Sequence, residues 1–278
     1  MPMMRSGKGC WRWLLPLAAL VAAAGQSPDN RAQVAYDKAN SLFEQKNLPG
    51  SLAALEEALG VDPDNVPALT LKAKIAISVN RPEIAGECLE RAVAADPASW
   101  YAHFLYGFWY YLRGDYSRAI SELASSRKLN PKDARSPLYL GMAYERIGDA
   151  QNTMTYYGEA LRLEDATGTP DPYTLVANSR ALQLLGRLDE CTKILSRALK
   201  LYPSHRDVQY ELGRLLLKQG DAKGAIKAGE AALQLPIEDV TDLQIHYLLA
   251  RAYQAGGDAQ HAAQQAAAIR AARAQEAK

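Results

Sequence analysis

Two stretches within residues 100–131 carry the hydrophobic pattern of a pair of α-helices. The first, Trp100–Leu112, is apolar and rich in aromatic residues, and the second, Tyr116–Lys128, repeats small and apolar residues at helical spacing along one side. Gly114 and Asp115 separate the stretches, because glycine tolerates a left-handed backbone and aspartate caps the helix that follows. A proline ends the pair, since it cannot donate the next helical hydrogen bond. The pattern therefore predicts a helix, a Gly-Asp turn and a second helix.

This arrangement of hydrophobic and turn-forming residues recurs at a nearly constant interval. The prolines that follow the successive pairs are Pro63, Pro97, Pro131, Pro172, Pro203 and Pro236. The spacings between them are 34, 34, 41, 31 and 33, and the third spacing exceeds the first two by seven. A fixed period indicates an architecture built by repetition of one supersecondary unit.

A period of about 34 residues that contains two helices resembles the tetratricopeptide repeat (TPR). That family has small residues at positions 8, 20 and 27, large residues at positions 11 and 24, and proline at position 32 of each repeat. In the repeat that ends at Pro131, positions 8, 11, 20, 24 and 27 hold Gly107, Tyr110, Ala119, Leu123 and Ser126 in that order. The small residues let neighbouring helices approach closely, and the large ones fill the space that remains.

Seven repeats match this register between residues 32 and 272. The fourth has Asp165 where proline is expected, and the second helix of the seventh is mostly Ala and Gln. The resemblance implies an all-α fold, a right-handed superhelical solenoid of about seven helix-turn-helix repeats. The seven extra residues fall within 164–171, a turn-rich segment that we expect to form an exposed loop, either a tolerated insertion or a contact or hinge. Residues 273–278 are expected to be a tail.

The N-terminal segment, residues 1–25, differs from the repeats. Three basic residues precede the apolar stretch Leu14–Ala24, and the small residues of Ala22–Gly25 stand where a signal peptidase would cleave. A membrane span needs about 20 apolar residues, so we expect residues 1–25 to be a cleaved export signal and the mature protein to be periplasmic or secreted. Membrane anchoring by residues 13–24 and a misassigned start of the chain are the alternatives.

Composition and charge narrow the class of protein further. Runs of alternating Val, Ile and Thr, which would indicate a sheet, are missing from the sequence. The formal net charge is only +1, whereas sequence-independent nucleic-acid binding requires a strongly basic surface, so we expect no nucleic-acid partner. Cys88 and Cys191 fall three repeats apart, beyond the reach of a disulfide, and we expect both to be buried free thiols.

The TPR resemblance implies that the first helix of each repeat lines a concave groove, with positions 2, 5, 9, 12 and 13 facing it. Two groups of large residues occupy such positions. The aromatic group consists of Tyr101, Phe104, Phe108 and Tyr111. The arginine group combines arginines and tyrosines of later repeats, Arg180, Tyr210, Arg214, Tyr247 and Arg251. These nine residues form the predicted peptide-binding groove.

The arginine group predicts a ladder, because Arg180, Arg214 and Arg251 all occupy position 9 of successive repeats. The guanidinium is a planar fork of donors that stacks on aromatic rings, and the tyrosines lie one turn before two of the arginines. Such a ladder suits an acidic, extended peptide. The alternative is a solvated surface on which the arginines pair with nearby acids such as Glu211.

The aromatic group predicts an exposed patch, which is the kind of surface that marks a partner site. Burial under a neighbouring helix or loop is the alternative, because aromatic residues are common in cores. The TPR family's site for a terminal carboxylate uses Lys and Asn at positions 5 and 9 of its first repeat. Tyr36 and Asn40 hold those positions here, so only the Asn matches and that specificity cannot be carried over.

The sequence contains no motif for catalysis or for a cofactor. Its four histidines fall in different repeats, and none has Cys, Asp or Glu at metal-ligand spacing. Nucleophile-elbow, phosphate-loop and dinucleotide-binding motifs do not occur. We therefore expect no enzymatic activity, no cofactor, no metal and no small-molecule substrate.

These observations favour one hypothesis, a non-enzymatic scaffold or adaptor of the cell envelope. It would bind a protein or peptide partner, acidic or anchored by aromatic residues, in the concave groove of its TPR array. Two alternatives remain open. One is a structural spacer that self-associates through its alanine-rich C-terminal helix, and the other is an accessory subunit of an enzyme complex.

Overall fold

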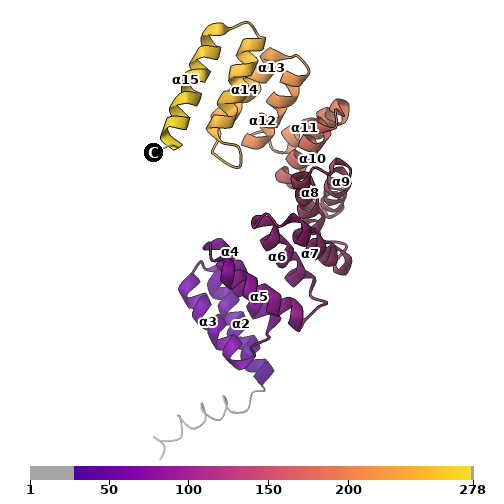
Figure 1. Ribbon diagram of the computed structural model, residues 1–278, viewed down its shortest axis with the longest axis vertical. Coiled ribbons are helices and arrows are strands. Elements are labelled where there is room, and N and C mark those ends of the chain that lie inside the picture. Colours follow the sequence, from indigo (N-terminus) through magenta and orange to yellow (C-terminus); the bar gives the residue numbers. More distant parts are fainter. Residues whose placement is uncertain (1–27, 277–278) are drawn as a thin grey trace, which may run out of the picture. The chain divides into compact units, whose positions relative to one another are not determined.

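The computed structural model describes residues 28–276, which form fourteen α-helices and no β-strand (Figure 1). The helices are α2 (Pro28–Glu44), α3 (Leu48–Val61), α4 (Val66–Ser78), α5 (Pro82–Ala95), α6 (Trp100–Leu112), α7 (Tyr116–Leu129), α8 (Arg135–Ile147), α9 (Ala150–Thr167), α10 (Pro172–Leu184), α11 (Leu188–Leu201), α12 (Arg206–Lys218), α13 (Ala222–Leu233), α14 (Asp242–Ala255) and α15 (Ala259–Glu276). The all-α prediction is therefore confirmed for this part of the chain. The predicted export signal at residues 1–25 lies outside the described residues.

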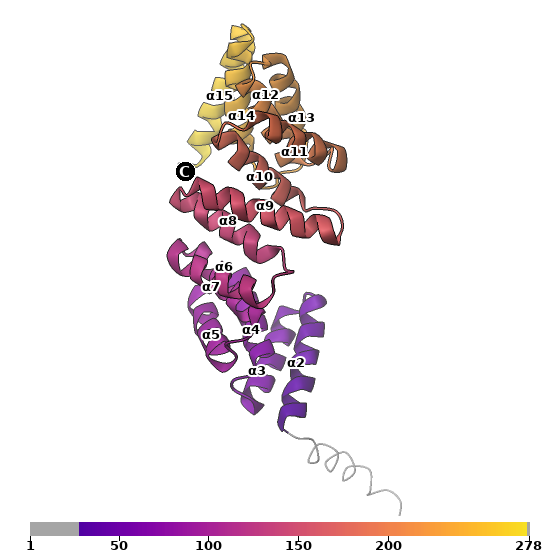
Figure 2. The same cartoon turned by 90° about the vertical axis from the view of Figure 1, so that its right-hand side faces the viewer.

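Helices pack chiefly as pairs of chain neighbours, as a repeat of two helices requires. The pairs α2 and α3, α4 and α5, α8 and α9, α12 and α13, and α14 and α15 make the most extensive contacts, and α7 with α8, α10 with α11 and α13 with α14 come next. Figure 2 shows α8 and α9 lying side by side. Each short helix is marginal alone and becomes stable by burying its apolar side against its partner.

The structure confirms the helix pair on which the repeat was based. α6 has the predicted bounds, and α7 ends one residue later than expected, at Leu129. Gly114 has φ of +75°, in the left-handed region where glycine is favoured. The Asp115 side chain accepts a hydrogen bond from the backbone N–H of Arg118 at 3.1 Å, which caps α7.

Small residues allow the close helix packing that the register predicts. Ala119 and Ser126 are fully buried on α7 together with the large Leu123. At position 8 of the fourth repeat, a Cβ on Gly141 would lie 2.4 Å from the ring of Tyr157, closer than real contacts allow. Position 8 must therefore be glycine here, because the ring fills the space that a side chain would need.

The chain divides into two compact units between Trp109 and Tyr110, within α6. In the first unit, Leu55 and Ile75 belong to a core of small and aliphatic side chains from α2, α3 and α4. The second unit has several smaller clusters, one of which includes Leu195 of α11. Each unit thus has its own apolar core.

The segment 164–171 is a loop only in part. α9 continues to Thr167, so the predicted exposed loop is reduced to residues 168–171. The extra helical residues are held by side-chain contacts. The Glu164 carboxylate accepts hydrogen bonds from the Asp171 backbone N–H at 3.0 Å and the Thr174 hydroxyl at 2.8 Å, and Asp165 pairs with Arg197 of α11. Turn-forming residues therefore indicated the connection but not where it begins.

Two further expectations concern the C-terminal residues and the cysteines. α15 extends to Glu276, so residues 273–276 continue the helix and do not form a separate tail. Cys88 and Cys191 are buried free thiols, as predicted. Burial raises the pKa of the Cys191 thiol to about 11, which keeps it protonated and unreactive at neutral pH.

Candidate functional site

In the second unit, the first helices of successive pairs run in the same direction. Tyr173 near the start of α10 packs against His205, directly before α12, with ring centroids 5.4 Å apart. At the other end, the Lys218 ammonium at the end of α12 donates to the Gln183 carbonyl near the end of α10 at 2.5 Å. Arg206 at the start of α12 similarly contacts Asp242 at the start of α14. The starts of these helices therefore lie on one side of the unit, and their ends lie on the other.

A hollow of about 960 Å³, which we name the tyrosine groove, is lined by residues of this unit. Its five tyrosines are Tyr111, Tyr116, Tyr139, Tyr157 and Tyr173, and its apolar residues are Leu138, Met142, Ala177 and Leu184. Its charged residues are Arg135, Glu145, Arg146, Asp171, Arg180 and Asp239. Three cations and three anions thus surround a largely aromatic and apolar surface.

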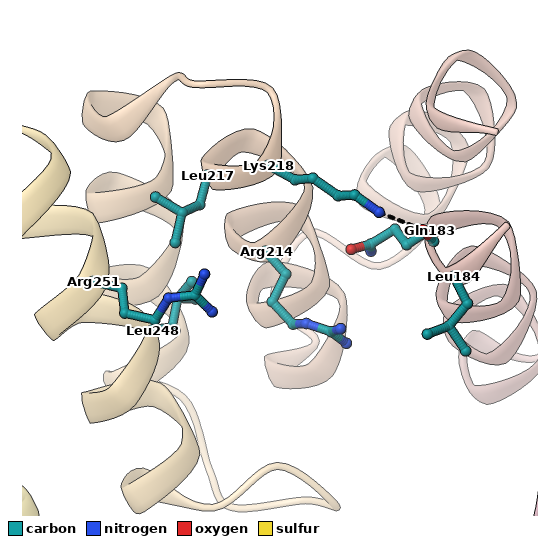
Figure 3. Close-up of a pocket in the computed structure, with 7 residues that line it drawn as sticks. All are labelled: Gln183, Leu184, Arg214, Leu217, Lys218, Leu248 and Arg251. Atoms are coloured by element: carbon teal, nitrogen blue, oxygen red, sulfur yellow. Dashed lines mark hydrogen bonds between the residues drawn. The ribbon is translucent and has the colours of Figure 1, made fainter. Parts of the chain in front are cut away.

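A second hollow of about 360 Å³, the cationic pocket, lies between the C-terminal halves of α10, α12 and α14 (Figure 3). Arg214, Lys218 and Arg251 line it together with Gln183, Leu184, Leu217 and Leu248. In Figure 3 the Arg251 side chain extends from α14 toward α12, and Lys218 reaches across to α10. Leu184 is 71% exposed and lines both the pocket and the tyrosine groove, so the two hollows adjoin.

The Glu211 carboxylate contacts two arginines of the predicted ladder, Arg180 and Arg214. Glu211 is only 1% exposed, and both of its carboxylate oxygens accept hydrogen bonds from the Arg214 guanidinium at 3.0 Å. Arg180 of the preceding repeat lies 3.3 Å from the same carboxylate, and Gln183 donates to it at 3.2 Å. Burial raises the pKa of Glu211, and the two arginines oppose that rise. The carboxylate therefore fixes where these two guanidinium groups point.

The three ladder arginines are consequently not equivalent. Arg180 and Arg214 pair with Glu211, which is the alternative to a free arginine ladder. Arg251 is exposed, and it has no ion pair or hydrogen bond with any residue in the described range 28–276. Among the residues that the structure describes, Lys218 donates only to the Gln183 backbone carbonyl, and no carboxylate there neutralises its charge. The free cationic character of the pocket thus comes chiefly from Arg251 and Lys218.

The two predicted tyrosines of the arginine group have different surroundings. Tyr210 is half-buried, and the Arg214 guanidinium carbon lies 5.9 Å from its ring centroid, in the pairing that the sequence predicts. Tyr247 is exposed, but the cation over its ring is Arg273 of α15, at 5.5 Å. Helical spacing alone predicts Arg251 as the neighbour and misses Arg273, which comes from another helix.

The aromatic group is more buried than the sequence predicts. Phe104 is only 6% exposed, which contradicts its predicted exposed face, and Tyr101 and Phe108 are half-buried. Phe104 stacks on both neighbours, with ring centroids 6.3 Å from Tyr101 and 6.5 Å from Phe108. Tyr111 behaves differently, because it packs against Tyr116 and Tyr139 and lines the tyrosine groove. The partner patch is therefore not supported as a group of four.

The acidic residue Asp239 in the connection between α13 and α14 was not predicted as part of the site. Arg206, which is 1% exposed, donates to the carbonyls of Val240 at 2.8 Å and Leu235 at 2.7 Å. The buried Asp207 carboxylate accepts from the Val240 N–H at 3.0 Å. These contacts fix the connection to the start of α12 and place Asp239 at the tyrosine groove. No sequence pattern marks Asp239, because the burial of Arg206 and Asp207 that fixes this connection is a property of the fold.

Comparisons with known proteins identify the repeat. Sequence profiles described as tetratricopeptide repeat match residues 32–105, 110–167 and 177–239, which is most of the chain. The protein therefore belongs to the tetratricopeptide repeat family, whose members are generally non-catalytic scaffolds that bind protein or peptide partners. A search of curated proteins found no significant match.

Solved structures show the same helical repeat architecture. PilF of Pseudomonas aeruginosa is 18% identical, with a TM-score of 0.67 over 75% of this chain and 93% of that one. YrrB, described as a TPR protein with an unusual peptide-binding site, is 17% identical, with a TM-score of 0.55 over 70% and 96% of the two chains. The Cut9–Hcn1 structure of the APC/C is 17% identical, with a TM-score of 0.68 over 86% of this chain and 45% of that one. At these identities the likeness concerns the fold alone.

Among the described helices, none combines the length and the apolar character needed to cross a bilayer.

Proposed function

We propose that the protein is a non-enzymatic scaffold or adaptor that binds a protein or peptide segment in the tyrosine groove and the adjoining cationic pocket. Membership in the TPR family supports this, as does the similarity to YrrB, whose description names a peptide-binding site. The observation that carries the proposal is the cationic pocket itself. Arg251 and Lys218 present charges that no carboxylate among the described residues neutralises, beside the exposed apolar side chain of Leu184.

This combination suits an acidic segment that also carries apolar or aromatic side chains. Cationic side chains recognise carboxylates by charge-assisted hydrogen bonds, and Arg adds geometric specificity through its planar fork. Four tyrosines of the tyrosine groove, Tyr111, Tyr116, Tyr139 and Tyr173, offer rigid, amphipathic contact area, whereas Tyr157 is buried. Tyr and Arg are enriched among residues that dominate binding energy. The partner is therefore proposed to be acidic at the pocket and anchored by apolar or aromatic residues at the groove.

Charge reversal in the pocket tests this proposal. The double variant Arg251→Glu with Lys218→Glu should reduce partner capture at least about tenfold, because like charges repel an acidic segment. Capture by the full-length protein from its native cells would be quantified by cross-linking and mass spectrometry at low and moderate salt. Weakened capture with reduced salt sensitivity is the expected result.

The matched control is Lys223→Glu with Lys227→Glu. Both lysines are exposed on α13 and line neither hollow, yet the net charge changes by the same amount. This control should capture partners as the unmodified protein does. Equal capture by all three proteins would rule out the pocket as the binding surface.

We also propose that the protein acts in the cell envelope or outside the cell, after removal of residues 1–25 as an export signal. The support is the basic head, the apolar stretch Leu14–Ala24 and the small residues of Ala22–Gly25. Mass spectrometry of the protein from its native cells should find a mature N-terminus near Gly25. An intact Met1 would refute cleavage, and an intact N-terminus in the membrane fraction would favour anchoring by residues 13–24.

A further inference from the structure

Two pairs of residues with opposite charge lie at different sides of the tyrosine groove and cationic pocket, and Arg135, Glu145, Arg146 and Arg180 also line the groove. The helix starts and helix ends form separate sides, because α10, α12 and α14 run in the same direction. Asp171 and Asp239 lie at the side of the helix starts, and both are exposed. Lys218 and Arg251 lie toward the side of the helix ends. We name these pairs the acidic side and the basic side.

Neither side is neutralised by an ion pair within residues 28–276. Asp239 has no ion pair or hydrogen bond with any residue of the described part of the chain, and Arg251 has none either. Arg135 lines the groove near the acidic side, but it pairs with Asp133 at 2.8 Å and so does not replace a partner for Asp239. Complementary charges on a partner would therefore be paired on both sides.

The distance between the sides limits the kind of partner. Arg251 lies nine residues after Asp242 on α14, or about 14 Å at 1.5 Å per residue. Lys218 lies twelve residues after Arg206 on α12, or about 18 Å by the same rise. An extended chain covers these distances in about four to six residues at roughly 3.3 Å each.

An extended segment suits the lining of the hollow. The tyrosine groove, a hollow of about 960 Å³, presents aromatic and apolar side chains along its surface. An extended segment crossing it can place alternate side chains against that surface.

We propose that the site selects an extended segment with a basic residue and an acidic residue about four to six positions apart, separated by apolar or aromatic residues. The basic residue pairs with Asp239 on the acidic side, and the acidic residue pairs with Arg251 and Lys218 on the basic side. This inference rests on the proposed function and adds the partner's charge pattern to it.

Selection from a random library of displayed 12-residue peptides tests this pattern with the full-length protein as bait. Peptides selected on the unmodified protein should be enriched in an acid and a base at this spacing. On Arg251→Glu with Lys218→Glu the enriched acid should disappear, and on Asp239→Lys the enriched base should disappear. Synthetic copies of the selected peptides should lose at least about tenfold in affinity for either variant, and the Lys223→Glu with Lys227→Glu control should match the unmodified protein.

The outcomes separate this inference from the proposed function. Peptides that bind the unmodified protein and both charge-reversed variants equally, or that show no charge spacing, contradict the charge pattern and leave groove binding in place. A selection that yields no peptide above background on the unmodified protein contradicts both. Circular dichroism checks that each variant folds. If a charge-reversed variant fails to fold, the neutral variant Arg251→Gln or Asp239→Asn takes its place. The expected losses of affinity are in the same direction.

Discussion

At the scale of single residues, one buried carboxylate distinguishes arginines that are equivalent in the sequence. Arg180, Arg214 and Arg251 share position 9 of their repeats, but only the first two contact Glu211. Those two are held in place by the carboxylate, whereas Arg251 has no such partner among the described residues. Repeat position predicts which way a side chain faces, and the contacts between repeats decide how much of its charge remains available.

The ionisation of Glu211 should make stability depend on pH in a defined direction. Burial raises the pKa of Glu211 in the folded protein, while the unfolded carboxylate ionises near pH 4.3, roughly the model-peptide value. As pH rises between these two pKa values, the unfolded state loses its proton first and is favoured. The free energy of unfolding of the unmodified protein, relative to Glu211→Gln, should therefore fall as pH increases through this interval. Urea denaturation across a pH series measures the difference.

Glu190→Gln is the control with the opposite sign. Arg187 donates to the exposed Glu190 carboxylate at 2.7 Å and lowers its pKa. The unmodified protein should therefore gain a small amount of stability relative to Glu190→Gln as pH rises through the carboxylate range. A stability difference for Glu211→Gln that also increases with pH would contradict our account of the buried carboxylate.

At the scale of helices, the sequence predicts the repeats well because packing determines their pattern. The bounds of α6 and the cap at Asp115 follow from residues that act locally. The end of α9 was not predicted, because Glu164 and Asp165 are held in the helix by contacts with α10 and α11. Turn-forming residues show where a helix can end, whereas contacts from other helices decide where it does end.

Two glycines in one helix pair test the packing explanation directly. Gly141→Ala should destabilise the protein by about 1–3 kcal/mol, because its Cβ would collide with the ring of Tyr157. Gly158→Ala on α9 should stabilise the protein by about 0.5–1 kcal/mol, because alanine favours the helix. No described side chain or neighbouring helix lies within 4 Å of the place that the new Cβ would occupy. Thermal and urea unfolding followed by circular dichroism would measure both changes. Equal effects of the two substitutions would show that intrinsic helix propensity, and not the Tyr157 ring, governs position 8.

At the scale of the whole molecule, the sequence predicts the family and part of the site. Arg180, Arg214 and Arg251 were named from repeat positions, and the structure places all three beside the hollows of the second unit. Asp239 was missed because its position depends on the buried contacts of Arg206 and Asp207 with a connection more than thirty residues later. Phe104 was misjudged because position within a repeat indicates which way a side chain faces and does not reveal how much of it is covered.

The central claim is that partners bind in the tyrosine groove and cationic pocket, and site-specific photo-cross-linking tests it most directly. At the test positions, a photoreactive phenylalanine analogue would replace Leu184 or Tyr173, which are both exposed and line the groove. At the control positions it would replace Thr192 or Lys193, which are exposed on α11 and line neither hollow. Illumination of the native cells, followed by mass spectrometry, should give partner adducts from the two groove positions and none from α11. Adducts that form on α11 and are absent from the groove would contradict the account.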